Sequence, residues 1–155
     1  MQRKHNQAKQ HFAYKNDTED LVALGQFFRE AFTGITVKRE WFILFDARTG
    51  AYVRTQEREP TSRQYKYRHP DLMIFNGKFS KTVTVIMEKP LVCFELDGSI
   101  HTAHMSETWE RNEQYKLAQI YLAVTNKLEI KHSMFDDAYS KISEILQDKF
   151  KLLRK

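Results

Sequence analysis

Acidic residues interrupt or border the apolar runs within residues 68–104, and they restrict what that part of the chain can form. Valine, isoleucine, leucine and phenylalanine dominate residues 72–75 and 91–96, a composition typical of buried β-strands. Yet Asp71 stands directly before the first of these runs, and Glu95 and Asp97 lie in or just after the second. Burying a carboxylate without a partner costs several kcal/mol, so packing alone does not explain three of them.

The spacing of these acids predicts that they converge. Glu95 and Asp97 are two residues apart, so on a strand both project from the same face. If the strand after Asp71 is the neighbour, three carboxylates meet, and they repel one another unless a cation lies between them. Such hard oxygen ligands favour Mg²⁺ or Mn²⁺. The alternative interpretation is that Asp71, after a proline, and Asp97, before a glycine, are turn residues, and that Glu95 is a charge on an edge strand.

The composition favours a single soluble domain. A chain of 155 residues with 41% hydrophobic residues is expected to bury a core. No apolar run approaches the roughly 20 residues that a membrane helix needs, and the first residues lack the apolar segment of a signal peptide. The one cysteine, Cys93, has no cysteine partner for an internal disulfide. These features predict a cytoplasmic protein without a membrane partner.

The net charge of +5 is partly localised. Residues 1–15 carry four cations and no acid, and a second basic cluster leads directly to Asp71: Arg54, Arg58, Arg63, Lys66 and Arg68. Solvated surface is a sufficient explanation for either cluster. A basic approach to an acidic pocket is also what a protein needs if it cuts a polyanion with a metal ion.

The order of expected elements indicates the fold class. Residues 1–16 lack apolar periodicity and predict a flexible basic arm, so the domain is expected to span 17–155. Helices are expected from Asn16 or Asp17 to Gly34, over 106–121, and after a capping box at Ser133 and Asp136. Strands are expected over 35–45, 51–55, 71–75, 82–87, 91–96 and 122–132, with a mobile loop over 56–67 and a hairpin joining 71–75 to 82–87. This order predicts an α/β fold with a mixed central β-sheet flanked by helices.

Pro70-Asp71, followed by Glu95-Leu96-Asp97-Gly98-Ser99-Ile100-His101, resembles the signature of the PD-(D/E)XK nuclease superfamily, and of its very-short-patch-repair-like group in particular. That signature is an aspartate at a strand start, then a strand ending in Glu-x-Asp-Gly with a histidine soon after. A helix with charged residues follows, and Arg111 and Lys116 lie in the corresponding place. The resemblance covers about residues 68–131. It departs from the superfamily at Asp97, where a lysine is usual, and the general base is therefore left open.

The resemblance implies a restriction-endonuclease-like core and a divalent-metal-dependent endonuclease that hydrolyses DNA phosphodiester bonds. Asp71 and Glu95 would bind Mg²⁺ or Mn²⁺, joined by Asp97 or a carbonyl beside it, and His101 would position or deprotonate the attacking water. DNA would be the partner, with RNA and a homodimer left open. The residues expected to contact nucleic acid are Arg58, Arg63, Lys66, Arg68, Arg111 and Lys116.

Two other function classes fit the same sequence. A non-catalytic nucleic-acid-binding module, or a degenerate nuclease fold that serves as a partner surface, would keep the basic clusters but would not use Asp71 and Glu95 as a pair. A small structural or viral interaction protein would explain the basic arm and the amphipathic C-terminal helix. Loss of activity in Glu95→Ala with binding intact would separate the enzyme from both.

Overall fold

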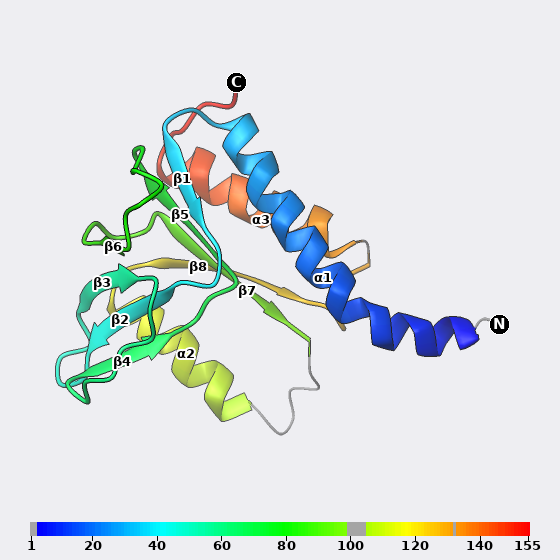
Figure 1. Ribbon diagram of the computed structural model, residues 1–155, viewed down its shortest axis with the longest axis horizontal. Helices are drawn as coiled ribbons and strands as arrows, with labels where there is room; N and C mark the ends of the chain where they lie inside the picture. Colours follow the sequence, from blue (N-terminus) through cyan, green and yellow to red (C-terminus); the bar gives the residue numbers. More distant parts are fainter. Residues whose placement is uncertain (1–2, 99–104, 132) are drawn as a thin grey trace.

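The strands fall into two separate sheets, and the helices lie around them (Figure 1). The computed structural model describes residues 3–98, 105–131 and 133–155, with the side chains of 3–16 and 105 outside this description. The described part contains three α-helices and eight strands, in the order α1 (Arg3–Ala31), β1 (Ile35–Lys38), β2 (Phe42–Asp46), β3 (Tyr52–Gln56), β4 (Tyr65–Arg68), β5 (Leu72–Asn76), β6 (Val85–Ile86), β7 (Val92–Asp97), α2 (Met105–Leu117), β8 (Tyr121–Asn126) and α3 (Met134–Glu144), which continues as a π-helical turn, Ile145–Lys149.

The first sheet is mixed and has the order β1-β5-β7-β8. β5 runs antiparallel to β1 and β7, whereas β7 and β8 run parallel. α2 connects β7 to β8, in agreement with the rule that parallel strands need a long crossover. The second sheet, β4-β2-β3-β6, is entirely antiparallel.

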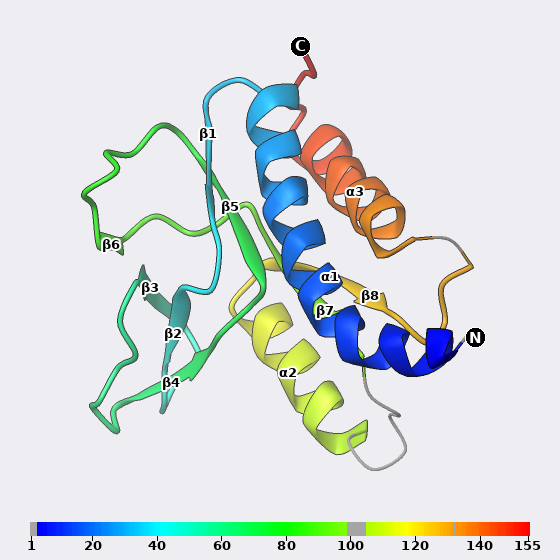
Figure 2. The same ribbon diagram turned by 45° about the vertical axis from the view of Figure 1, so that its right-hand side comes forward.

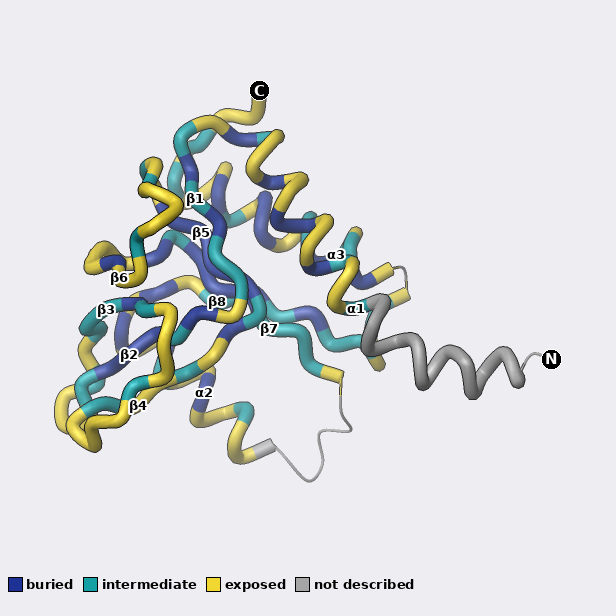
Figure 3. The backbone as a smooth tube through the Cα atoms, viewed as in Figure 1, coloured by how far each residue is buried: buried dark blue, intermediate teal, exposed yellow. Residues whose placement is uncertain are grey.

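Both α1 and α3 cover one face of the first sheet, and the two helices lie side by side (Figure 2). Leu24 and Phe28 of α1 and Ile142 of α3 are fully buried against Ile74 and Phe94 of the sheet. Each such side chain contributes about 1.5–3 kcal/mol by leaving water. This layer fixes β5 and β7 as the two central strands of the sheet, and both are largely buried in Figure 3.

The opposite face of the first sheet packs on the second sheet and on α2. Ile43 and Phe45 of β2 meet Met73 and Cys93, and Tyr115 of α2 joins the same cluster. Because successive strand residues alternate between faces, the residues of β7 that share a face with Cys93 point toward α2. Glu95 and Asp97 are those residues. Within the described residues, no helix combines the length and the apolar character that crossing a bilayer requires.

The expectation of an α/β fold with a mixed sheet flanked by helices is confirmed, but several boundaries differ. The first helix begins at Arg3 rather than near Asp17, and residues 3–16 contain no glycine or proline that would interrupt it. The strand expected over 35–45 is two strands in different sheets. They are separated at Glu40, whose φ of 62° is incompatible with an extended strand.

Three further expectations differ from the structure, one about a strand partner and two about strand boundaries. Residues 71–75 do not form a hairpin with 82–87, because β5 pairs with β1 and β7 while β6 pairs with β3. The turn at Gly77 exists, but its N–H donates to the Gly34 carbonyl at 2.7 Å and so ties it to the start of β1. The expected loop over 56–67 ends in β4, and β8 stops at Asn126, whose side chain accepts a turn hydrogen bond from the Leu128 N–H.

Candidate functional site

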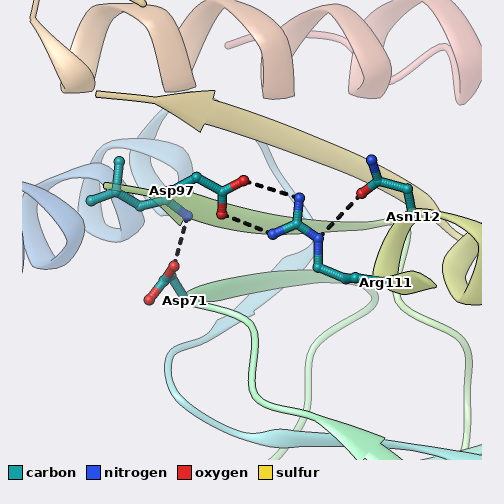
Figure 4. A network of polar contacts seen from close by, with 5 residues as sticks. Asp71, Asp97, Arg111 and Asn112 are labelled. Atoms are coloured by element: carbon teal, nitrogen blue, oxygen red, sulfur yellow. Dashed lines mark hydrogen bonds and ion pairs between the residues drawn. The ribbon is translucent and has the colours of Figure 1, made fainter. Parts of the chain in front are cut away.

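Asp71 and Glu95 lie opposite each other on the two central strands of the first sheet. Leu72 pairs with Phe94, so Asp71 and Glu95 adjoin this pair at the same end of the two strands, and the charge of Asp71 acts on Glu95. The Asp71 N–H donates to the Phe94 carbonyl at 2.9 Å and holds Asp71 against β7. The Leu96 N–H donates to Asp71 Oδ2 at 2.7 Å and holds that carboxylate at the strand end (Figure 4). The two acids that the sequence placed in different apolar runs are therefore cross-strand neighbours.

Glu95 is the more perturbed of the two acids. Burial, and after it the negative charge of Asp71, raises the pKa of Glu95 to about 8, and the positive charges of Arg111 and Arg68 offset only part of this. Burial also raises the pKa of Asp71, partly offset by its hydrogen bond from Leu96. Among the described residues, none donates a hydrogen bond to the Glu95 carboxyl group. Without a cation, the pair therefore holds a proton on Glu95 at neutral pH.

Asp97 binds Arg111 of α2 through both carboxylate oxygens. Arg111 Nη1 lies 2.8 Å from Asp97 Oδ1 and Nη2 lies 3.1 Å from Oδ2, with the two side chains 9% and 14% exposed (Figure 4). Arg111 Nε also donates to Asn112 Oδ1 at 3.2 Å. Such a bidentate ion pair fixes the guanidinium in one orientation. Asp97 therefore holds a cation beside Glu95, a partner that the sequence did not predict.

A second cation reaches the site from β4. Arg68 Nε donates to Gln114 Oε1 of α2 at 2.7 Å, and its Nη2 lies 3.9 Å from Glu110 Oε1. Its charge is among those that lower the pKa of Glu95. Two arginines from different elements thus flank the acid pair. A hollow of about 660 Å³ between α2, β8 and α3 opens beside this group and includes Asp97, Arg111, Lys131 and Lys141 in its wall.

The expected site residues do not all gather. Asp71, Glu95, Asp97, Arg68 and Arg111 come together. Arg58, Arg63, Lys66 and Lys116 are exposed, and none of them forms an ion pair within the described residues. His101 lies outside the described residues. Nor does the described part of the chain bring three histidine, cysteine, aspartate or glutamate side chains into a group that could hold a metal ion.

Arg111 was expected on the nucleic-acid surface, and its place beside the acids was not anticipated. Its spacing carried the signal, because residues 111, 115 and 118 recur at helical intervals and all three are buried in α2. A charged residue on the buried face of a helix requires a partner of opposite charge, and Asp97 was available.

Comparisons of the chain with models of known protein families, with curated proteins and with solved structures found no match. What the chain does is therefore inferred from the geometry of this site.

Proposed function

We propose that this protein is a divalent-metal-dependent endonuclease that hydrolyses DNA phosphodiester bonds, built on a restriction-endonuclease-like core. The observation that carries the proposal is the facing of Asp71 and Glu95 on the two central strands of a mixed sheet. A buried acid pair without compensating hydrogen bonds on Glu95 is costly for the fold, and function is a reason to keep it.

The residues present fit Mg²⁺ or Mn²⁺. Proteins usually hold Mg²⁺ through one or two carboxylates and leave its other positions to water and to substrate phosphate oxygens, so a third protein acid is not required. Asp71 offers Oδ1, because Oδ2 accepts from Leu96, and Glu95 offers both oxygens. The ion would polarise the scissile phosphate and lower the pKa of a bound water.

The chain's own residues would prepare the site for that ion and for a phosphate. Leu96 orients Asp71, and Glu95 would lose its proton to hold a cation as a carboxylate. Asp97 is a positioning residue that directs the Arg111 guanidinium toward the acid pair. Arg111 thereby supplies the positive charge that the superfamily usually draws from a lysine at position 97, and Arg68 adds a second one. Both are suited to bind a phosphate oxygen.

Cleavage assays with matched variants test this proposal. Supercoiled plasmid, duplex, single-stranded DNA and RNA are incubated with Mg²⁺ or Mn²⁺, and Asp71→Asn and Glu95→Gln are each expected to lower the cleavage rate at least about 100-fold. Glu113→Gln is the control, because Glu113 is an exposed acid of α2. Calorimetry with Ca²⁺ should show binding by the wild type and loss of binding in Glu95→Gln. Undiminished cleavage by Glu95→Gln would overturn the proposal.

A non-catalytic nucleic-acid-binding protein is the second candidate. It is favoured by the engagement of Asp97 with Arg111, which leaves two acids instead of three for an ion. For that function, the wild type would bind nucleic acid without cleaving any of the four substrates in either metal, and Glu95→Gln would bind equally well.

A further inference from the structure

The outer face of the second sheet carries several aromatic rings, and these rings lie outside the central core. Ile43 and Phe45 point inward, so the alternate residues of β2 and of its neighbours point outward. On this face Phe42 stacks on His69 with ring centroids 4.3 Å apart, and Tyr67 meets Phe42 edge to face at 5.6 Å. Tyr65 extends the row along β4, and the Arg54 guanidinium lies 5.0 Å from its ring centre.

Part of this aromatic row is open to solvent. Tyr67 is 40% exposed and His69 is exposed, whereas Phe42 and Tyr65 are half-buried. β4 is an edge strand of its sheet, and Figure 3 shows it and the segment before it mostly in the colours of exposed and intermediate residues. Leu44, below the row, is fully buried, so the rings also have a covering role that the test must separate from binding.

The positive charge around the aromatic row favours the binding of a polyanion. Residues 54–68 carry five cations and two acids. Arg58 and Arg63 are exposed and form no ion pair within the described residues, whereas Lys66 alternates with Tyr65 and Tyr67 on β4 and projects from the other face. The acid Glu59 lies beside the aromatic row and reduces this positive charge. Its Oε2 accepts a hydrogen bond from the Tyr67 hydroxyl at 3.0 Å. Exposed rings beside unpaired cations are the combination that binds unpaired nucleotides, because bases stack on the rings and phosphates meet the cations.

The row also leads to the acid pair. Only Pro70 separates His69 from Asp71, and the charge of His69 acts on the pKa of Asp71. From these observations we infer that the outer face of β4 and β2, with Phe42, Tyr65, Tyr67 and Arg54, is a stacking platform for unpaired nucleotides that delivers a single strand to Asp71 and Glu95. The part concerning delivery rests on the proposed function, whereas the stacking does not. Bases of an intact duplex are already stacked on one another, so a duplex cannot use such a platform.

Binding measured without metal ions tests the platform by itself. Fluorescence anisotropy in EDTA compares labelled twelve-nucleotide oligo(dT) and oligo(U) with a DNA duplex of the same length. The wild type is expected to bind at least one unpaired oligonucleotide more tightly than the duplex, and the two arms decide between DNA and RNA. Tyr67→Leu, which keeps an apolar cover over Leu44, should weaken that binding about tenfold, the effect of one lost stacking contact. Tyr67→Phe should retain it, and Glu59→Gln should strengthen it a few-fold.

A matched control keeps the result specific. Tyr121 of β8 is 42% exposed and meets Phe150 edge to face at 5.5 Å, so Tyr121→Leu removes an equivalent ring from another surface and should leave binding unchanged. Circular dichroism and melting temperature establish that each variant is folded, and Phe42→Leu repeats the test should Tyr67→Leu fail to fold.

Three outcomes would each overturn the platform: equal or tighter binding of the duplex, no binding of either oligonucleotide, or wild-type binding by a folded Tyr67→Leu. If the wild type binds an oligonucleotide but does not cleave it in Mg²⁺, only the proposed nuclease activity is overturned. If the face instead binds a protein partner, the wild type will bind neither oligonucleotide.

Discussion

Glu95 is the carboxylic acid whose proton the fold controls most strongly. Its pKa is about 8 in the folded chain and lies near 4.5 when exposed, so between these values the folded state holds a proton that the unfolded state has lost. A state that binds more protons is destabilised as pH rises. In metal-free solution this group therefore leaves the protein most stable below pH 4.5 and removes stability progressively up to about pH 8.

Glu95→Gln imitates the protonated acid and should remove this pH dependence. The variant is expected to unfold with the same free energy as the wild type near pH 4.5 and to exceed it by of order 5 kcal/mol near pH 9, since the two pKa values differ by about 3.5 units and one unit corresponds to about 1.4 kcal/mol. Urea unfolding in EDTA at several pH values measures the difference. A constant difference across the range would show that Glu95 is as accessible to water as an ordinary surface acid.

The Asp97–Arg111 pair should matter for stability through the charge that is left behind. Asp97→Asn leaves the guanidinium buried without its counter-charge, which typically costs about 3–5 kcal/mol. Replacing both partners by apolar residues, Asp97→Leu with Arg111→Met, should restore most of that loss, because well-packed apolar pairs substitute for buried ion pairs. Denaturant unfolding of the single and double variants measures the coupling. A neutral Asp97→Asn would mean that Arg111 reaches water instead.

At the scale of elements, the cap of α3 is the feature that local sequence determined most directly. Ser133 has the extended backbone of an N-cap, and its Oγ accepts from the Asp136 N–H at 3.1 Å, which confirms the expected helix start. Ser133→Ala should lower the free energy of unfolding by about 1 kcal/mol, while Ser133→Asp should preserve it. Thermal melts report the change. Equal melting temperatures for Ser133→Ala and the wild type would show that tertiary contacts, and not the cap, fix the start of α3.

Strand partners depended on contacts that no local pattern reveals. The apolar runs predicted β5 and β7, and the spacing of Glu95 and Asp97 predicted that they share a face, because alternation on a strand is local. The turn residues at Asn76 and Gly77 suggested a hairpin, yet Gly77 hydrogen bonds to Gly34, far away in sequence. The second sheet was missed for the same reason, since β2 joins β3 and β4 only after the chain turns at Glu40.

Contacts between side chains of different elements were predicted less well than the strands were. Asp97 and Arg111 are 14 residues apart and meet only because α2 folds back over β7. Their pairing changes the electrostatics of the site, since the third acid comes with its own cation. The alternation of β7 placed Asp97 on the correct face, whereas its partner required the arrangement of α2.

At the scale of the whole molecule, the two basic segments noted in the sequence lie far apart. The start of α1, within the basic residues 1–15, lies at one end of the structure, and the second sheet with residues 54–68 lies at the other (Figures 1 and 2). The acid pair at the ends of β5 and β7 is reached from β4. A polyanion bound along the second sheet would therefore pass Asp71 before it reached the start of α1.

The salt dependence of nucleic-acid binding measures how many phosphates the second sheet engages. Each cation in contact with a phosphate releases counterions, so log K falls with log salt by about 0.9 per contact on duplex DNA and about 0.7 on a single strand. Arg58→Gln combined with Lys66→Gln should weaken binding and reduce the slope by about 1.4 on single strands. Lys149→Gln with Lys151→Gln removes the same charge from the exposed end of α3 and should change the slope little. Titrations between low and moderate salt decide the matter, and equal slopes for both double variants would show that residues 54–68 are only solvated surface.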